Sequence, residues 1–308
     1  MFFYTVSGLS VASEIALPGL IANSIPSDES DVTIRQGSVP SALEQPTANG
    51  PNWQLADGQF LLRVPDIVSM LLTAGRAITF ELSPQVKIED ALPFLNGTGF
   101  GILLHQRGRF VLHASAVRVG DRAMLFCGPS GAGKSTIAAA LVEAGFDLIT
   151  DDFCALSLTE DGQIMAEPDG RQLKLWQSAI DRLSLNEQRL GSVRPALEKF
   201  YVTPRSETST SLPLGGVYQL VERRLKGADG IDPLNIVDGA IAIRRNAYRP
   251  GLVAKLRQQE LYFRMSANIS RQAGVFTLTR ALGFENMEKV LASLREHWLD
   301  LGLLEAVA

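Results

Sequence analysis

The stretch LHASAVRVGDRAMLFCGPSGAGKSTIAAALVEAGFDLITDD, residues 112–152, decides the fold. Its centre, Gly128 to Thr136, satisfies the pattern G-x-x-x-x-G-K-[S/T] of phosphate-binding loops (P-loops). A strand-like run, 123–127, comes directly before the loop, and a helix-like run, 134–144, comes directly after it. Because strand, loop and helix follow in the required order, the sequence predicts an α/β protein that binds a nucleotide.

Each residue type in this loop has a physical reason. The three glycines allow backbone conformations that are closed to other residues, so the loop amides can turn inward around phosphate oxygens. The helix that begins near Lys134 adds the positive end of its dipole. Lys134 can reach the β- and γ-phosphates, and the Ser135 hydroxyl can ligate Mg²⁺. The expected nucleotide contacts are Gly128, Ser130, Gly131, Ala132, Gly133, Lys134, Ser135 and Thr136.

Two adjacent carboxylates, Asp151 and Asp152, follow the short apolar strand predicted at 146–150. They come only 16 and 17 residues after Ser135. One can hold the Mg²⁺ shell while the other accepts the proton of an attacking hydroxyl. The alternative is an exposed turn or a helix cap, which adjacent aspartates also form. The residues alone leave open which aspartate has which task.

A histidine and several basic residues are further candidates. His113, on the strand predicted at 110–119, could donate a hydrogen bond near the γ-phosphate, although a strand histidine is as often a core residue. Arg171 and Lys174 follow a Pro-Asp-Gly turn and are candidate ligands of substrate or phosphate. A solvated basic surface is the alternative for each such residue. The full set of basic candidates is Arg171, Lys174, Arg194, Lys199 and Arg205.

Composition limits the class of protein. The chain has 308 residues, a formal net charge of −4 and 46% hydrophobic residues, which is typical of a globular protein with about two domains. An acidic chain has no overall field for nucleic acid or a membrane surface. Two cysteines and three histidines exclude a disulfide scaffold and a histidine-rich metal site. The N-terminus lacks the features of a signal peptide, so a cytoplasmic location is expected.

The pattern outside the loop predicts two parts, a β-rich domain at 1–95 and a catalytic domain at 96–308. Strands are expected at 2–9, 32–35, 60–64, 69–73 and 78–82, with a loop at 45–52. Helices are expected at 89–106, 174–183, 251–273 and 284–303, and strands at 155–158, 216–221 and 275–280. Trp176 is expected in the core, and the polar run 206–211 is expected as a mobile loop.

The quoted stretch resembles the catalytic core of the HPr kinase/phosphorylase family, with a strand histidine, a P-loop and an Asp-Asp pair at similar spacing. The resemblance implies a fold like that of phosphoenolpyruvate carboxykinase. It implies that Asp151 is the general base, that Asp152 lies near the metal, and that His113 lies near the transferred phosphate. The glycine-rich LEIRGLG-type stretch of HPr kinases is absent. The runs 167–183 and 193–202 look more like HPr-kinase-like proteins of peptide natural-product machinery, including lasso-peptide precursor kinases.

The expected function is therefore an ATP- and Mg²⁺-dependent serine kinase that acts on a protein or peptide, such as a lasso-peptide-type precursor. A small-molecule P-loop kinase, an HPr-type regulatory kinase/phosphorylase and a non-catalytic nucleotide-binding module are the alternatives. No nucleic acid or membrane partner is expected. The family's kinases are often oligomeric, so a homo-oligomer is left open.

Overall fold

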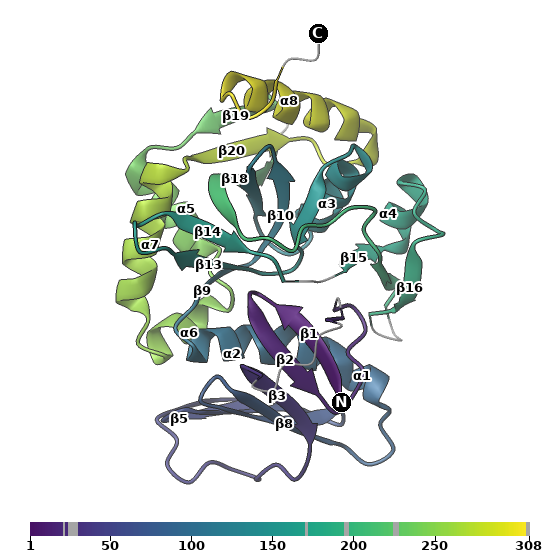
Figure 1. The fold of residues 1–308 in the computed structure, drawn as a ribbon, viewed down its shortest axis with the longest axis vertical. Coiled ribbons are helices and arrows are strands. Elements are labelled where there is room, and N and C mark those ends of the chain that lie inside the picture. The colour runs from purple at the N-terminus through teal and green to yellow at the C-terminus, as the bar shows by residue number, and fades with distance from the viewer. Residues whose placement is uncertain (21, 24–29, 170–171, 194–196, 224–227, 306–308) are drawn as a thin grey trace.

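Three β-sheets and the helices between them make up the part of the chain that the computed structural model describes: residues 1–20, 22–23, 30–169, 172–193, 197–223 and 228–305. Figure 1 shows the N-terminal sheet at one end and the larger central sheet at the other, with a helical segment between them. The predicted α/β class and the β-rich N-terminal part are thereby confirmed.

The N-terminal sheet has eight strands that run through the first 82 residues. Their spatial order is β1 (Phe2–Val6), β2 (Leu9–Ser13), β3 (Val32–Gln36), β8 (Ala77–Leu82), β7 (Val68–Thr73), β6 (Gln59–Val64), β5 (Trp53–Ala56) and β4 (Ala48–Gly50). The single strand predicted at 2–9 is wrong, because Ser7 and Gly8 both have positive φ and form a two-residue turn. The loop predicted at 45–52 is also wrong in part, since Gly50 pairs with Trp53 in a tight hairpin.

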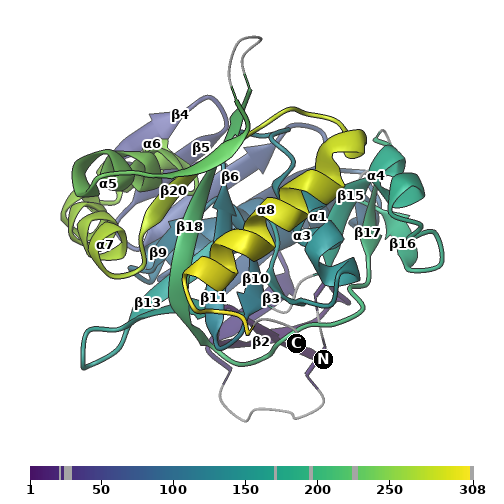
Figure 2. The ribbon, with the colours of Figure 1, turned by 90° about the horizontal axis from the view of Figure 1, so that it is seen from above.

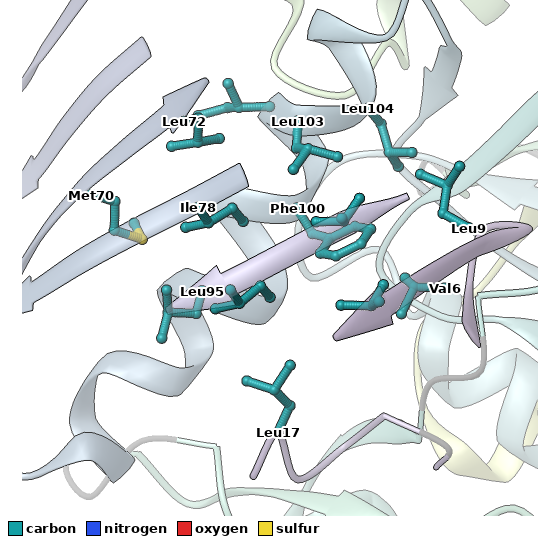
Figure 3. Packing of buried hydrophobic residues seen from close by; sticks show 14 of the residues in the cluster. Val6, Leu9, Leu17, Met70, Leu72, Ile78, Leu95, Phe100, Leu103 and Leu104 are labelled. Atoms are coloured by element: carbon teal, nitrogen blue, oxygen red, sulfur yellow. The ribbon is translucent and has the colours of Figure 1, made fainter. Parts of the chain in front are cut away.

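A continuous helical segment follows, confirming the helix predicted at 89–106. It consists of α1 (Ile88–Pro93), the π-helical η1 (Phe94–Gly99) and α2 (Phe100–Gln106). Its apolar side chains pack against the N-terminal sheet, and Figure 3 shows Phe100 between Val6, Leu9 and Ile78. Buried residues on both sides of position 95 therefore share one core, and the boundary between 95 and 96 stays a prediction.

The central sheet contains the strands that flank the loop. The order is β12 (Asp147–Thr150), β10 (Ala114–Val119), β11 (Arg122–Cys127), β18 (Leu212–Glu222), β14 (Ile164–Glu167), β13 (Cys154–Leu158) and β9 (Phe110–Leu112), with β20 (Val275–Arg280) beside β18 and β19 (Gly230–Pro233) beside β20. Strand β11 is buried on both faces. Met124 and Phe126 point into one core while Ala123, Leu125 and Cys127 point into another, as the two-residue repeat of a strand requires.

Helices cover both faces of this sheet (Figure 2). On the face of Phe126 lie α3 (Lys134–Glu143) and α8 (Met287–Asp300), which follows the short 3-10 helix η2 (Phe284–Asn286). On the opposite face lie α5 (Ile236–Arg245) and α7 (Gln259–Gln272), with α6 (Pro250–Lys255) between them in sequence. Helix α5 was not predicted from the sequence. The helix predicted at 251–273 is two helices.

A small third sheet covers one end of α3. It has the order β15 (Leu173–Trp176), β17 (Lys199–Val202) and β16 (Arg189–Ser192), and α4 (Gln177–Arg182) follows β15. The helix predicted at 174–183 is therefore wrong over its first three residues. Lys174 to Trp176 pair with β17 as a strand, because backbone hydrogen bonds to a distant segment override local helix preference.

No helix in these described ranges is long and apolar enough to cross a bilayer. Both cysteines, Cys127 and Cys154, are buried free thiols.

Replacing Phe100 with alanine tests the packing between the helical segment and the N-terminal sheet. Its ring is fully buried, so Phe100→Ala should lower the free energy of unfolding by about 3–5 kcal/mol. Urea unfolding followed by circular dichroism measures this. Leu299→Ala, on the solvent side of α8, is the control and should change it by less than about 0.5 kcal/mol. Equal effects of the two variants would contradict the assigned core.

Candidate active site

The glycine-rich loop links β11 to α3. Gly128, Gly131 and Gly133 have φ values of 154°, 85° and 84°, a region that favours glycine. Gly133 precedes the first residue of α3, so the helix N-terminus begins at Lys134. The strand–loop–helix order predicted from the sequence is confirmed.

Lys134 lies folded over this loop. Its Nζ donates to the carbonyl oxygens of Gly128, at 2.9 Å, and Pro129, at 3.1 Å. The side chain is buried, and burial lowers its pKa below the ordinary value, while the nearby groups of Cys127, Asp151 and Asp152 oppose that shift. The ammonium is thus held by neutral carbonyls at the loop that the sequence assigns to phosphate.

A second cation lies beneath the loop. Arg280, the last residue of β20, is only 5% exposed and donates from Nη2 to the carbonyl oxygen of Ala132. A Cβ atom added to Gly133 would lie 2.7 Å from this Nη2 atom. Because the guanidinium fills the space beside it, Gly133 has both a conformational and a steric reason to lack a side chain.

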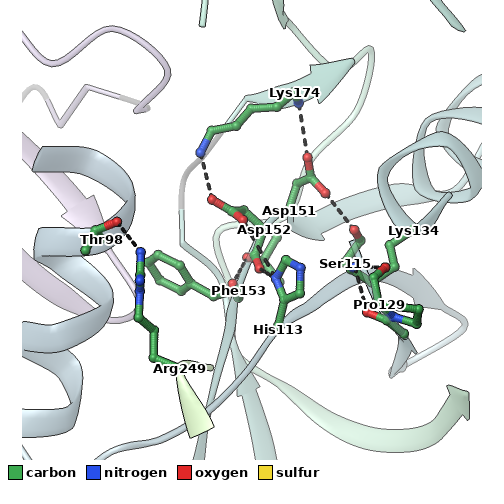
Figure 4. A network of polar contacts seen from close by, with 12 residues as sticks. Thr98, His113, Ser115, Pro129, Lys134, Asp151, Asp152, Phe153, Lys174 and Arg249 are labelled. Atoms are coloured by element: carbon green, nitrogen blue, oxygen red, sulfur yellow. Dashed lines mark hydrogen bonds and ion pairs between the residues drawn. The ribbon is translucent and has the colours of Figure 1, made fainter. Parts of the chain in front are cut away.

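The carboxylate of Asp151 is fixed from two sides. Ser115, on β10, donates from Oγ to Oδ1 at 2.6 Å, and the backbone amide of Lys174, on β15, donates to Oδ2 at 3.1 Å. Asp151 is only 1% exposed, and a buried carboxylate needs such partners. These two bonds join the end of β12 to β10 and to β15 (Figure 4).

Asp152 faces the opposite way, into solvent-accessible space. Its backbone has φ 84°, which for a residue other than glycine costs on the order of 1–3 kcal/mol. Its Oδ2 accepts from Lys174 Nζ at 2.8 Å, and its Oδ1 lies 3.8 Å from His113 Nδ1. The left-handed turn therefore directs two consecutive carboxylates in different directions: Asp151 inward and Asp152 outward.

His113 breaks the strand predicted at 110–119, because it stands in a bend between β9 and β10. Its backbone amide bonds to the Asn246 carbonyl, and its Nδ1 lies 2.6 Å from the carbonyl oxygen of Asp152. A carbonyl only accepts, so Nδ1 has the proton and, in the neutral ring, Nε2 is the free acceptor. Burial and the Lys134 ammonium lower the pKa of His113, which favours that neutral form.

These groups share one pocket of about 300 Å³. It is lined by residues from the loop, from the end of β12 and from β15: His113, Ser130, Gly131, Gly133, Lys134, Ser135, Thr136, Asp151, Asp152, Lys174, Leu175, Trp176 and Lys199. The structure thus brings together most of the residues that the sequence assigned to a site. Ala132 instead lines a hollow of about 250 Å³ on the other side of the loop, together with Leu220, Val221 and Arg280.

A larger cleft of about 990 Å³ adjoins this pocket and shares His113, Asp152 and Lys174 with it. Its other walls come from the helical segment near Thr98, from the end of α5, and from Tyr248 and Arg249. Its volume lies at the upper end of the range of small-molecule and cofactor sites.

The oxygen donors of the small pocket suit a hard cation. Ser135, Asp151 and Asp152 offer one hydroxyl and two carboxylates, which is the ligand type that Mg²⁺ prefers. In the described ranges no three histidine, cysteine, aspartate or glutamate side chains gather into a metal cage. Mg²⁺ at nucleotide sites is held mainly by phosphate and water, so one or two protein oxygens suffice.

Some basic candidates do not reach this site. Arg205 pairs with Glu143 at 2.9 Å and lines neither the pocket nor the cleft. Arg171 and Arg194 lie outside the described residues. Trp176, expected in the core, is 48% exposed and lines both hollows, because β15 ends at the mouth of the cleft.

Sequence reasoning missed several residues that complete the site. Ser115, one of three small residues at 114–116 directly after His113, was not predicted as a site residue, yet its hydroxyl holds Asp151. Arg280, Tyr248 and Arg249 belong to segments more than 90 residues after the loop. The small-residue run next to a histidine was a signal for Ser115, whereas no local pattern marks the other three.

No protein-family model matches this sequence, and no curated protein matches it. Among solved structures, the chain is similar to the HPr(Ser) kinase/phosphatase from Coxiella burnetii, with a TM-score of 0.34 and 12% identity. The match covers 62% of this chain and 92% of that chain. A likeness this distant defines neither the reaction nor the substrate of this chain.

The histidines make stability depend on pH. Burial lowers the pKa of His105, His113 and His297 in the folded protein, so below about pH 6.5 the unfolded chain binds more protons. Their contribution is complete above pH 6.5 and is lost as pH falls through the folded-state values. We expect the free energy of unfolding, measured in urea, to fall from pH 7 to 5.5. His113→Asn should show a shallower fall, and an unchanged slope would contradict the assignment.

Proposed function

We propose that this protein is an ATP- and Mg²⁺-dependent phosphotransferase that moves the γ-phosphoryl group to a serine hydroxyl of a peptide or protein. One observation carries the proposal: the loop with Lys134, the pair Asp151–Asp152 and His113 line one pocket. That pocket adjoins a cleft with room for a second substrate. A nucleotide-binding module without catalysis would use one carboxylate for Mg²⁺ but has no need of a second one, Asp152, that also lines the cleft.

The nucleotide fits along the loop. Its phosphates would meet the loop amides, Lys134 and the N-terminus of α3, which together form an anion site. Its base suits the hollow behind the loop, whose walls are largely apolar. Arg280 lines this hollow and donates to the Ala132 carbonyl oxygen of the loop.

Ser135 and Asp151 are the residues that would hold Mg²⁺ beside the phosphates. When bound, the ion neutralises negative charge on the β- and γ-phosphate oxygens. Asp151 suits this task because Ser115 and the Lys174 amide fix its orientation while one edge still lines the small pocket.

Asp152 is the better candidate for the general base. It lines both the small pocket and the cleft, whereas Asp151 lines the small pocket only. Lys174 Nζ orients its carboxylate, and His113 lies beside it. The family resemblance implies that Asp151 is the base and that Asp152 lies near the metal. We propose the opposite assignment, because the carboxylate of Asp152 is the accessible one.

The proposed step balances in atoms and charge. The serine oxygen forms a bond to the γ-phosphorus while the bond from that phosphorus to the β–γ bridging oxygen breaks. ADP leaves, and the hydroxyl proton passes to the Asp152 carboxylate. Lys134 stabilises the charge that moves onto the leaving phosphate.

A peptide acceptor is supported by the cleft and by the sequence. The cleft opens beside the phosphate pocket, and the exposed ring of Trp176 at its mouth suits a chain segment. The resemblance to HPr-kinase-like proteins of peptide natural-product machinery supports the same class, with a lasso-peptide-type precursor as one example.

Removing the charge of Asp152 tests the base. Asp152→Asn keeps the size of the side chain but cannot accept the proton, so transfer from ATP to a serine peptide should fall at least about 100-fold. Nucleotide affinity, measured by titration calorimetry, should change by less than about threefold, since the loop is intact.

Asp121→Asn is the matched control, because Asp121 is exposed in the turn between β10 and β11. It should transfer phosphate at the wild-type rate. Full activity of the Asp152 variant would show that Asp152 is not the base.

Removing the Lys134 ammonium tests the nucleotide site itself. Lys134→Met should weaken ATP binding at least about tenfold, equivalent to 1.4 kcal/mol, because a charge-assisted contact to phosphate is lost. Lys289→Met, on the exposed side of α8, should bind ATP as the wild type does. Unchanged affinity in the Lys134 variant would place the nucleotide away from the loop.

A further inference from the structure

The large cleft has a charge opposite to that of the chain. The protein has a net charge of −4, yet four cations line the described part of this cleft: Lys174, Lys199, Arg245 and Arg249. Asp152 is the one carboxylate among these described lining residues, and Lys174 lies 2.8 Å from it. The cleft therefore has an excess of positive charge where the acceptor would bind.

Two of these cations lie apart from the phosphate pocket. Lys174 and Lys199 line both hollows, whereas Arg245, at the end of α5, and Arg249, before α6, line the large cleft only. In Figure 4, His113 and Asp152 lie between Arg249 on one side and the loop residues Pro129 and Lys134 on the other. Their charge is thus available to a ligand other than the triphosphate.

Arg249 has a neutral partner. Its Nη2 donates to Thr98 Oγ1 at 2.6 Å, and its guanidinium lies 5.9 Å from the centre of the Tyr248 ring. Within the described ranges, neither Arg249 nor Arg245 lies within 4 Å of a carboxylate oxygen. A guanidinium held by a hydroxyl and an aromatic ring keeps donors for a planar anion.

The backbone at Arg249 supports a role in binding. Its φ of 50° and ψ of 62° are left-handed, although it is neither glycine nor asparagine and precedes a proline. Asp152, across the cleft, is also left-handed. Strained residues concentrate at functional sites, and here both place a charged side chain in the same cleft.

We propose, resting on the phosphotransferase function above, that the acceptor is an acidic peptide segment. Its serine lies at Asp152, and a neighbouring aspartate or glutamate pairs with Arg249 and Arg245. The exposed apolar side chains of Trp176 and Leu197, which also line the cleft, contact the rest of the segment. Arg249 and Arg245 are then determinants of acceptor specificity and have no part in binding ATP.

Matched peptides test this directly. Fluorescein-labelled, end-capped peptides contain one serine flanked by Asp, by Asn or by Lys. Fluorescence polarisation measures their affinity in the presence of Mg²⁺ and a non-hydrolysable ATP analogue, which occupies the phosphate pocket. The Asp peptide should bind at least about tenfold tighter than the Asn peptide, and the ratio should fall as salt is raised.

Variants of the two arginines identify the source of this preference. Arg249→Gln and Arg245→Gln should each reduce the Asp/Asn ratio, and the double variant should bring it within about twofold of one. Arg249→Glu should favour the Lys peptide. Arg244→Gln is the matched control, because Arg244 is the exposed neighbour of Arg245 but does not line the cleft. It should keep the wild-type ratio.

Each outcome decides one claim. The proposal of an acidic acceptor is overturned if the wild type binds the Asp and Asn peptides equally. It is also overturned if the double variant keeps the wild-type Asp/Asn affinity ratio. Equal loss of affinity for all three peptides in Arg249→Gln would show a structural role and overturn it as well. Transfer from ATP is measured with the same peptides. If the Asp peptide binds selectively but receives no phosphate, the phosphotransferase proposal fails while the binding site for an acidic peptide stands.

Discussion

The site depends on the two hydrogen bonds that fix the buried carboxylate of Asp151. Ser115 holds one oxygen from β10, and the Lys174 amide holds the other from β15. A carboxylate that is 1% exposed would be strongly destabilising without them. Because they join three separate segments, they also determine where the next residue, Asp152, can turn, and they bring Lys174 and Trp176 to the mouth of the cleft.

Local sequence predicted the loop and its neighbours because their geometry is local. Glycines at fixed spacing and a helix that begins at Lys134 are properties of nine consecutive residues, and the structure has them. The acid pair at the end of a short strand was predicted for the same reason. The opposite orientation of the two carboxylates was not, because it results from the left-handed backbone at Asp152.

The rest of the site comes from pairing between distant segments. Lys174 to Trp176 have the composition of a helix but pair with β17, which turns Trp176 outward. His113 was expected on a continuous strand, whereas β9 and β10 pair with different partners and leave it in the bend between them. Arg249 lies 136 residues after His113, and only the tertiary fold brings both to one cleft.

In the proposed function, the two sides of the site receive two different anionic substrates. The loop side has a buried ammonium, a helix N-terminus and Arg280, which suit a triphosphate. The far side has arginines that face open space. Asp152 lies between them, beside a histidine whose pKa is lowered by burial and by Lys134. In the proposed function, Asp152 at this junction accepts the proton of the acceptor hydroxyl.

A crystal structure with Mg²⁺ and a non-hydrolysable ATP analogue tests the central claim most directly. The account predicts that the γ-phosphate lies within hydrogen-bond distance of Lys134 Nζ and faces Asp152, with the far wall of the cleft still open. A triphosphate bound away from the loop, or a γ-phosphate turned away from both aspartates, would contradict it.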